Sequence, residues 1–326
     1  MGYYVPDNIV TNNDLSKFMD TNDDWIRERT GISERRWVNP GEDSTSGMGV
    51  KAAQGALSNA GLEASDIDFI IFATLSPDYY FPGPGVQVQE ALGMDTIGAL
   101  DVRNQCSGFV YALSVADQFV RTGMYNNILV IGSELHSGGL DKSTRGRGVS
   151  VIFGDGAGAA VVVPSEDENR GILSTHLHSQ GAHAKELALV GPATARWVDK
   201  IIEEADPDDQ SYYPHMNGNF VFKHAVTRFP QVIMEALNAN GLKPADINLL
   251  VPHQANLRIS QFVQRTMKLN DDQVYSNIQK YGNTTAASIP IALSEAVQAG
   301  KVKNGDLVCL AAFGSGFTWA SALIRW

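Results

Sequence analysis

The sequence predicts an α/β fold that contains an internal duplication. Short apolar runs alternate with segments of helical spacing, a pattern typical of strands in sheets that are covered on both faces. The segment GLEASDIDFIIFAT at 61–74 resembles GLKPADINLLVPHQ at 241–254, and the two lie 180 residues apart. ALSVA at 112–116 and ALSEA at 292–296 keep the same separation. Two matches at one separation predict a repeated unit.

In the first half of the chain, the sequence pattern predicts a helix followed by a buried strand, and this order occurs twice. The segment 52–60 has helical spacing, and Gly61 after it is a residue type that commonly ends helices. The apolar run DFIIFAT at 68–74 is predicted as a buried strand. A second helix is predicted at 108–123, and the strand NNILVIGSE follows it at 126–134.

The second half repeats this order. A helix is predicted at 289–301 (IPIALSEAVQAGK), and a buried strand follows at 306–314 (DLVCLAAFG). The polar segment PSEDENR at 164–170 is the expected join between the halves. We therefore expect an N-terminal half that spans residues 1–165 and a C-terminal half that spans residues 166–326.

The composition limits the classes of function. The 326 residues carry 25 basic and 36 acidic side chains, which gives a net charge of −11. An acidic chain lacks the basic face that nucleic acids or anionic membranes require, although a local basic patch for an acidic partner is compatible with it. No apolar run approaches the roughly 18 residues that span a bilayer, and no secretion signal is visible. Two cysteines cannot form a disulfide framework, so we expect a cytoplasmic protein. The acidic stretch at 203–218 is predicted as a solvated loop.

Cys106 is a candidate nucleophile. It lies in DVRNQCSGFVYALS, between an apolar strand and a helix predicted to begin near Ser107. Free backbone amides at a helix N-terminus favour a thiolate, which predicts a lowered pKa for the thiol. The alternative is an inert buried cysteine, the usual state of this residue type. The other cysteine, Cys309, is predicted to lie in the core.

His253 and Asn283 are candidate partners of Cys106. His253 follows the second repeated strand in LLVPHQANLR, and Asn283 precedes a predicted helix in KYGNTTAASIPIALS. A histidine there can exchange a proton or donate a hydrogen bond, and a side-chain amide can donate to a developing oxyanion. Each also has a structural interpretation, since His253 could be capped or surface-exposed and Asn283 could form a turn or cap a helix. Equivalent loops of two halves usually meet near a pseudo-twofold axis, where functional groups can converge.

Two further motifs are weaker signals. FGDGAGAA at 153–160 contains a loose GxGxxA, but a dinucleotide site needs a helix after the glycines and AAVVV predicts a strand. Turn formation or close packing is the favoured interpretation. The histidines His176, His178 and His183 have no carboxylate or cysteine at ligand spacing, so we expect no metal site.

The sequence resembles 3-oxoacyl-acyl-carrier-protein synthase III over nearly its whole length. The motifs that carry the resemblance are NQCSGFVYAL, VPHQANLR, YGNTTAASIPIAL and FGSGFTWASALIRW, together with DTNDDWIRERTGISERRW and FGDGAGAAV. Members of this family have a thiolase-like five-layer αβαβα fold. The resemblance therefore implies that fold, a homodimer, and a condensing acyltransferase that initiates fatty-acid synthesis from acyl-CoA and malonyl-acyl-carrier protein without a cofactor.

The resemblance also implies roles for the three candidate residues. Cys106 would accept an acyl group from acyl-CoA as a thioester. His253 and Asn283 would stabilise the enolate oxygen as the malonyl group loses carbon dioxide. The backbone amides of Cys106 and Ser315 would hold the oxyanion that forms on the acyl carbonyl.

Other positions match family residues that contact substrates or partners. The matches to CoA-binding positions are Trp25, Arg29, Arg147 and, near the pantetheine arm, Asn219. Phe81 matches a residue that reaches into the acyl pocket of a partner subunit. Lys223, Arg258 and Arg265 are candidates for a basic patch that binds the acidic carrier protein. Ordinary surface packing and solvated charge are the structural alternatives for these residues.

The sequence departs from the family at two places. Ser315 stands in the sequence GSG where the family usually has three glycines, and a positive φ would strain a serine. Family members usually open with a strand before the Gly-x-Tyr-x-Pro segment, and this sequence begins inside that segment at Met1. We therefore expect strain at Ser315 and a missing first strand.

Two other classes of function stay open from the residues. A related enzyme of secondary metabolism could use the same Cys–His–Asn set to join two acyl chains or to acylate oxygen or nitrogen. A non-catalytic protein that binds acyl-CoA or the carrier protein could keep the fold, but it would be expected to have lost Cys106, His253 or Asn283. The length of the acyl primer depends on the shape of the pocket around Phe81 and cannot be predicted from the sequence.

Overall fold

Two sheets and three groups of helices form five layers. The computed structural model describes residues 1–194, 206 and 208–326. The first sheet has the order β1 (Gly2–Tyr4), β7 (Gly156–Val162), β6 (Ile128–Glu134), β4 (Phe69–Ala73) and β5 (Gly98–Val102). The second has the order β11 (Leu249–Pro252), β12 (Leu307–Gly314), β13 (Thr318–Arg325) and β8 (Gly171–Ser179). Each sheet is mixed, with parallel pairs such as β4–β6 and antiparallel pairs such as β6–β7.

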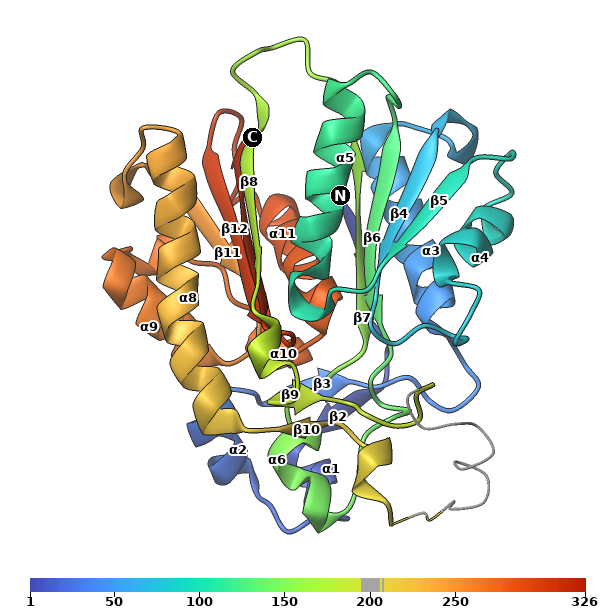
Figure 1. Ribbon diagram of the computed structural model, residues 1–326, viewed down its shortest axis with the longest axis vertical. Helices are drawn as coiled ribbons and strands as arrows, with labels where there is room; N and C mark the ends of the chain where they lie inside the picture. Colours follow the sequence, from blue (N-terminus) through green and yellow to red (C-terminus); the bar gives the residue numbers. More distant parts are fainter. Residues whose placement is uncertain (195–205, 207) are drawn as a thin grey trace.

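The long helices fill the other three layers (Figure 1). The central layer contains α5 (Gly108–Arg121) and α11 (Ser288–Gln298). The outer faces are covered by α3 (Thr45–Ala60) and α4 (Pro84–Ala91) on the first sheet, and by α8 (Gly218–Ala239) and α9 (Leu257–Met267) on the second. This arrangement is the thiolase-like αβαβα fold.

Shorter elements gather at the lower end of the molecule in Figure 1. They are the strand pairs β2 (Ile9–Thr11) with β3 (Glu34–Arg36) and β9 (Leu187–Ala188) with β10 (His215–Met216), and the helices α1 (Asn12–Leu15), α2 (Asp23–Thr30), α6 (Arg147–Ser150) and α10 (Ile278–Tyr281). Single 3-10 turns lie at 64–66, 105–107, 144–146, 181–183, 210–212, 244–246, 271–273 and 285–287.

The central helices are apolar because they are enclosed on both sides. Phe109 and Leu113 of α5 and Ile289 and Leu293 of α11 share one core cluster with Val130 from the first sheet and with residues of the second. A helix that is buried around most of its circumference needs apolar residues on every face. The short sequence repeat ALSVA and ALSEA lies in these two helices.

The predicted duplication is confirmed by the element boundaries. The helices α5 and α11 begin 180 residues apart, and so do the 3-10 turns before them at 105–107 and 285–287. The turns at 64–66 and 244–246, each followed by a buried strand, keep the same separation. One sheet uses residues 2–162 and the other uses residues 171–325, so the chain passes between them through the polar segment predicted as a join.

Several predicted details need correction. The helix before Gly61 begins earlier than expected, at Thr45, because the Ser44 side chain caps it by accepting from the amide of Gly47. The strand before Cys106, β5, is an edge strand rather than an apolar buried one, and its Leu100 is 38% exposed. The acidic stretch 203–218 contains β10 and the start of α8, while its residues 203–205 and 207 lie outside the described part of the chain.

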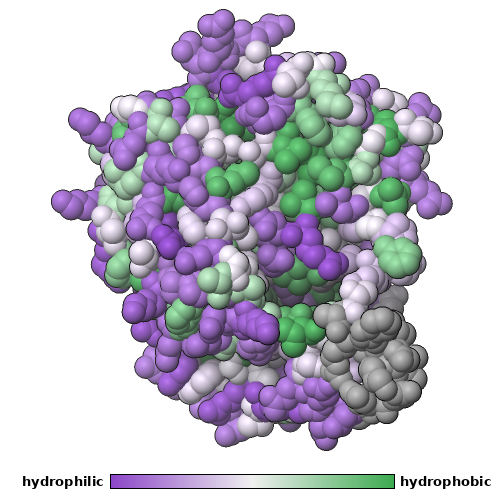
Figure 2. Space-filling view, viewed as in Figure 1, coloured by the Kyte–Doolittle hydropathy of each residue, from purple (hydrophilic) through white to green (hydrophobic). Residues whose placement is uncertain are grey.

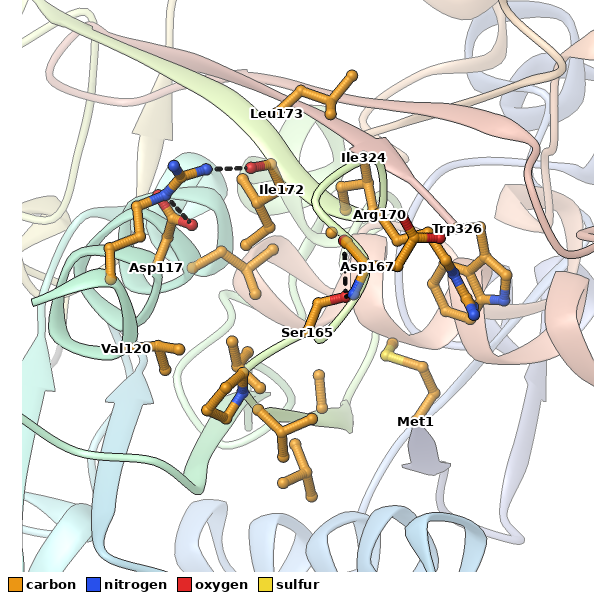
Figure 3. A pocket seen from close by; sticks show the side chains of 18 of the residues that line it. Met1, Asp117, Val120, Ser165, Asp167, Arg170, Ile172, Leu173, Ile324 and Trp326 are labelled. Atoms are coloured by element: carbon orange, nitrogen blue, oxygen red, sulfur yellow. Dashed lines mark hydrogen bonds and ion pairs between the residues drawn. The ribbon is translucent and has the colours of Figure 1, made fainter. Parts of the chain in front are cut away.

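The expectation that the first strand is missing is also wrong. Residues Gly2–Tyr4 form β1, which pairs antiparallel with 157–159 of β7. Because β6 pairs with all of β7 and β1 covers only these three residues, the other edge of Ala160–Val162 faces a groove of about 840 Å³. Figure 3 shows Met1 and Trp326 on one side of this groove, and residues of α5 from Phe109 to Arg121 also line it. No helix in the described residues is long and apolar enough to cross a membrane.

Candidate active site

Cys106, His253 and Asn283 line one cavity of about 370 Å³. Cys106 lies in the 3-10 turn that precedes α5, His253 directly follows β11, and Asn283 precedes the equivalent turn before α11. All three side chains are buried. The two halves therefore bring the predicted residues together at the ends of the central helices, as the duplication suggested.

The Cys106 thiol is a protonated group in the resting site. Burial raises its pKa to about 12, and the nearby Glu134 carboxylate adds to the increase. Hydrogen bonds from the Ser315 amide and the Thr285 hydroxyl lower the pKa without reversing this effect. The expectation that the start of the helix lowers the Cys106 pKa is therefore wrong, because loss of solvation outweighs the backbone amides.

His253 lines the cavity and is bonded through one ring nitrogen. Its Nδ1 lies 2.6 Å from the hydroxyl oxygen of Ser288, which also accepts from the Gln254 amide at 3.4 Å. The ring proton is on Nε2 when the Ser288 hydroxyl donates to Nδ1, and it is on Nδ1 when that hydroxyl accepts from the ring. Nε2 is buried and has no hydrogen-bond partner among the described residues. Burial lowers the pKa of His253 to about 3, so the ring is neutral at pH 7.

The side-chain amide of Asn283 is oriented by its own turn. Its Oδ1 accepts from the Thr285 amide at 2.8 Å, and its backbone bonds to residues 152 and 154 on either side of Phe153. The acceptor end of the amide is therefore occupied, and the Nδ2 donor end is available at the cavity that Asn283 lines. A neutral imidazole N–H and an amide N–H beside one thiol can stabilise negative charge on a carbonyl oxygen.

The comparisons with known proteins agree with this geometry. The family models "3-Oxoacyl-[acyl-carrier-protein (ACP)] synthase III" and its C-terminal counterpart match residues 100–181 and 237–326. The chain is 47% identical to beta-ketoacyl-[acyl-carrier-protein] synthase III of Rhodospirillum centenum, with 100% of this chain and 97% of the relative covered. It is 48% identical to the protein of that name from Alkalilimnicola ehrlichii, with the same coverage. The crystal structure of 3-oxoacyl-[acyl-carrier-protein] synthase III from Aquifex aeolicus superimposes with a TM-score of 0.91 at 42% identity, over 100% of this chain and 98% of that one.

The chain belongs to the 3-oxoacyl-acyl-carrier-protein synthase III family. It is an acyl-transferring condensing enzyme, and the comparisons do not favour the alternatives that the residues left open.

In this synthase, a hydrogen-bond network that the sequence analysis missed supports the turn beside Cys106. The buried carboxylate of Glu134 accepts from the hydroxyls of Thr74 and Ser76 and from the amides of Leu75 and Ser76. The amide of Ala286 adds a longer contact of 3.4 Å. Burial raises the pKa of Glu134 to about 7 despite these donors. Glu134 thus joins the turn at 285–287 to the loop after β4.

His136 is a second buried histidine, and it contacts the turn before α11. Its Nε2 lies 2.8 Å from the Thr285 hydroxyl oxygen, and its amide donates to Asp155 at 2.7 Å. Burial lowers the pKa of His136 to about 3. The sequence signal for His136 is its place two residues after a buried strand, the kind of position that singled out His253. Its contact with Thr285, 149 residues away, could not be predicted from the sequence.

The motifs PHQ and FGDG have structural explanations. Gln254 of PHQ donates to the Pro252 carbonyl and accepts from the Ser276 hydroxyl, which fixes the strand end that carries His253. The strand β7 follows FGDG, and a Cβ on Gly158 would lie 2.7 Å from Pro290 of α11. Close packing was therefore the right interpretation of this motif. The Asp155 carboxylate accepts from the amides at 136 and 137.

Trp25, Arg29 and Arg147 lie together at the mouth of the cavity. The Arg29 guanidinium lies 4.6 Å from the centre of the Trp25 ring, and that of Arg147 lies 5.1 Å from it. Trp25 and Arg29 line the cavity, and so do Asn219 and Arg258. An aromatic face with two flanking cations is an arrangement that suits a stacked base and a phosphate.

The remaining candidates lie outside the cavity lining. Lys223 and Arg265 are exposed on α8 and α9, two helices that pack against each other. Phe81 is 81% exposed and projects from the loop before α4. His176 and His178 both contact Glu235, and the described residues contain no cluster of three side chains that could hold a metal ion.

The expectation of backbone strain at Ser315 is wrong. Its φ angle is not positive, and the left-handed conformation falls on Gly316 at +129°. The Ser315 amide lowers the pKa of the Cys106 thiol, while the Ser315 hydroxyl donates to the Leu187 carbonyl of β9. The serine therefore adds a link between the turn after β12 and the small β9–β10 sheet, which a glycine could not make.

Proposed function

We propose that this chain condenses an acyl-CoA primer with malonyl-acyl-carrier protein by decarboxylative Claisen condensation and so initiates fatty-acid synthesis. The observation that supports this most strongly is the convergence of one thiol and two neutral N–H donors, from Cys106, His253 and Asn283, on one buried cavity. A thiol can hold the acyl group covalently, and two donors can stabilise the enolate formed by decarboxylation.

In the first half-reaction the Cys106 sulfur attacks the thioester carbonyl of acyl-CoA. The carbon–sulfur bond to CoA breaks, CoA leaves as a thiol, and the acyl group stays on Cys106. The backbone amides of Cys106 and Ser315 are the proposed donors to the tetrahedral oxyanion. The position of the neighbouring Gly314, where a Cβ would lie 2.7 Å from the Cys106 sulfur, and the lowering of the thiol pKa by the Ser315 amide support this assignment.

In the second half-reaction malonyl-acyl-carrier protein occupies the cavity. The N–H groups of His253 and Asn283 donate to its thioester carbonyl oxygen as the carboxylate leaves as carbon dioxide. The enolate carbon attacks acyl-Cys106, and the 3-oxoacyl product remains on the carrier protein. One preorganised donor of this kind can contribute about 3 kcal/mol to the transition state.

The mouth of the cavity suits the carriers of the two acyl groups. We assign Trp25, Arg29 and Arg147 to the nucleotide of CoA and Asn219 to its pantetheine arm, because three of the four line the cavity and Arg147 flanks the Trp25 ring. Lys223, Arg258 and Arg265 are the proposed contacts for the acidic carrier protein. The chemistry uses only these side chains and the two substrates, so we propose no resident cofactor or metal.

We propose that the enzyme works as a cytoplasmic homodimer of chains with two halves, 1–165 and 166–326. The edge strand β5 has a free side, and Tyr79, Tyr80 and Phe81 expose 59%, 64% and 81% of their surface. Figure 2 shows hydrophobic side chains gathered over α5 and the neighbouring strands of the first sheet. A second copy on this side would cover the apolar surface and could receive Phe81 in its acyl pocket.

The proposal is tested by separating the two half-reactions. A panel of acyl-CoA primers is incubated with the enzyme, acylation of Cys106 is followed by intact mass, and product is followed by chromatography after malonyl-acyl-carrier protein is added. Cys106→Ala should form no acyl-enzyme. Asn283→Ala should still acylate but should lose decarboxylation by about a hundredfold. Normal condensation by the Asn283→Ala enzyme would disprove the assigned role, and absence of acyl-Cys106 in the unmodified enzyme would disprove the proposed reaction.

A further inference from the structure

The Ser315 side chain joins the turn after β12 to the small sheet β9–β10. Its hydroxyl donates a hydrogen bond to the Leu187 carbonyl oxygen of β9, a residue 128 positions away in the chain. A glycine or an alanine at this position has no group that could make the bond. Because the bond connects two segments that are distant in the sequence, it limits how far one can move relative to the other.

The backbone of this turn is packed against the turn that carries Cys106. A Cβ on the neighbouring Gly314 would lie 2.5 Å from the Cys106 Cβ, so this position admits no side chain. The Thr318 hydroxyl oxygen lies 3.1 Å from the Ser315 carbonyl oxygen and 2.7 Å from the hydroxyl oxygen of Ser107. Both Thr318 and Ser107 are buried. The position of Ser315 is therefore fixed relative to Cys106.

The small sheet forms part of the wall of the cavity. Leu187 of β9 and Met216 of β10 are paired in this sheet, and both line the cavity that contains Cys106. The helix α8 begins directly after the sheet, and Gly218 and Asn219 of its first turn line the same cavity. Since Asn219 is our candidate for contact with the pantetheine arm, the sheet and the first turn of α8 are the part of the wall that this arm would meet.

The small sheet needs support from the rest of the protein. Its strands contain two residues each, and a two-stranded pair of this length is not stable alone in water. The Glu186 carbonyl and carboxylate accept from the Asn217 amide and side chain at 2.8 and 3.0 Å, which joins the two strands to each other. The helix α6 packs against β10, and the Ser315 hydroxyl joins β9 to the turn after β12.

We propose that Ser315 is a positioning residue, and that its hydroxyl holds the β9–β10 sheet at a fixed place relative to Cys106. This inference rests on the proposed function. The thioester of a substrate must reach the Cys106 sulfur while its pantetheine arm lies along the wall, so the place of the wall decides how well the arm fits. A wall that is held in place before the substrate arrives loses little further freedom on binding, and this favours affinity.

The expected effect is on binding more than on the bond-forming step. A change of the Ser315 side chain leaves its backbone amide, the proposed donor to the oxyanion, in the chain. One hydrogen bond of this kind contributes about three- to tenfold to an equilibrium constant. Because Leu187 and Met216 belong to the wall beside the pantetheine arm, loss of the hydroxyl should weaken the binding of any substrate that carries this arm.

Three variants of one position and one control separate the hydroxyl from the rest of the residue. Ser315→Ala and Ser315→Gly remove the hydroxyl, and Ser315→Thr keeps it. Ser321→Ala is the matched control. The Ser321 hydroxyl of β13 also donates to a main-chain carbonyl, at 2.9 Å, but its acceptor is Val232 of α8 and not a residue of the small sheet.

Two measurements are made on each protein. Hydrogen exchange of the substrate-free protein, followed by mass spectrometry on peptides that cover β9 and β10, reports how readily the small sheet opens. Single-turnover acylation of Cys106, followed by rapid quench and intact mass, gives a half-saturating concentration and a maximal rate. Acylation is measured with acyl-CoA and with acyl-pantetheine, which has the arm but lacks the nucleotide.

We expect exchange in β9 and β10 to be about three- to tenfold faster in Ser315→Ala and Ser315→Gly. The half-saturating concentrations of acyl-CoA and of acyl-pantetheine should both rise by about the same factor, and the maximal rate should change less than they do. Ser315→Thr should lie closer to the unmodified protein than to Ser315→Ala in both measurements. Ser321→Ala should change neither.

Other results overturn the proposal. Unmodified exchange in Ser315→Ala and Ser315→Gly would show that the hydroxyl does not hold the sheet. A lower maximal rate at an unchanged half-saturating concentration would show that Ser315 acts on the oxyanion and not on the wall. A Ser315→Thr protein that matches Ser315→Ala would exclude the hydroxyl as the cause, and equal effects in Ser321→Ala would indicate general loosening.

Two further outcomes are kept apart from these. If Ser315→Ala fails to fold, Ser315→Gly decides by the same criteria. If the unmodified enzyme does not acylate Cys106, the proposed function is refuted, and the exchange measurement still decides whether Ser315 holds the small sheet.

Discussion

Gln105 and Thr285 hold the same left-handed backbone conformation, with φ angles of +46° and +48°, at equivalent positions of the two halves. Each opens the 3-10 turn before a central helix, and the two turns pack against each other. Gly132 lets β6 approach the second turn, since a Cβ at this position would lie 2.5 Å from the Ala286 carbonyl oxygen. The duplication therefore gives a symmetric scaffold in which one turn carries the proposed nucleophile Cys106 and the other carries Thr285, whose hydroxyl oxygen lies 2.8 Å from Nε2 of His136.

Gly314 is predicted to be irreplaceable for catalysis. A Cβ at this position would lie 2.5 Å from the Cys106 Cβ and 2.7 Å from its sulfur. Gly314→Ala should therefore displace the thiol and reduce acylation by about a hundredfold, the cost of a displacement of roughly 1 Å in a reacting group. Intact mass after incubation with acyl-CoA measures this. Gly181→Ala, where a Cβ meets no atom within 4 Å, is the matched control, and normal acylation by Gly314→Ala would contradict the prediction.

The two buried histidines should make the fold sensitive to acid. The pKa values of His136 and His253 are lowered from 6.5 to about 3, so the unfolded chain binds protons that the folded chain excludes. This contribution to stability is complete above pH 6.5 and is lost as the pH falls toward 3. Between pH 7.5 and pH 5 each histidine should account for a loss of about 2 kcal/mol.

Urea unfolding at the two pH values measures the effect. His136→Leu should lose about 2 kcal/mol less than the unmodified protein over this interval. The contribution of Glu134 to the pH dependence of stability has the opposite sign. Its pKa is raised from 4.5 to about 7, so its stabilising contribution is complete below pH 4.5 and is lost as the pH rises through 7. Glu134→Gln should therefore lose more stability than the unmodified protein on acidification. The same pH dependence in all three proteins would contradict the prediction.

The Trp25 ring should contribute to the binding of the CoA nucleotide. Stacking of a base on an aromatic ring is worth about 1–3 kcal/mol, so Trp25→Ala should raise the KM for acyl-CoA by about tenfold. Acyl-pantetheine lacks the nucleotide and is the matched substrate, for which the KM should change little. An equal rise in both KM values would show that Trp25 acts on the shape of the cavity and not on the nucleotide.

The free edge of β5 should be the dimer interface. Leu100→Asp places a charge on that edge and should shift the enzyme toward monomers in sedimentation velocity, because an unpaired carboxylate opposes burial. Phe262→Asp is the matched control, since Phe262 on α9 is also 38% exposed and lies on the other outer face. If Phe262→Asp dissociates the dimer and Leu100→Asp does not, the interface lies at α9 and not at β5.

The local motifs singled out three residues that the structure places on one cavity. Cys106, His253 and Asn283 each stand at the end of a strand or the start of a helix, and such positions can be identified from a few neighbouring residues. The repeat added the expectation that they converge. The Ser315 prediction failed because the left-handed residue in that turn is Gly316, and the sequence GSG does not show which position takes the positive φ.

The electrostatic prediction failed because burial sets the pKa of the thiol. The start of α5 predicted a lowered pKa for Cys106, but the pKa depends on how much water the whole cavity excludes. The contact between His136 and Thr285 could not be predicted for a related reason, since Thr285 belongs to the other half of the chain.

The sequence by itself determined the alternation of helices and strands and the duplication, and it singled out Cys106, His253 and Asn283 as candidates, because these depend on patterns within short segments. The tertiary structure alone decided which groups are desolvated, which side chains share one cavity and where the edge of the first sheet is open. Those properties depend on contacts between residues far apart in the chain, and the free energy of a charge or a proton is set by everything that surrounds it.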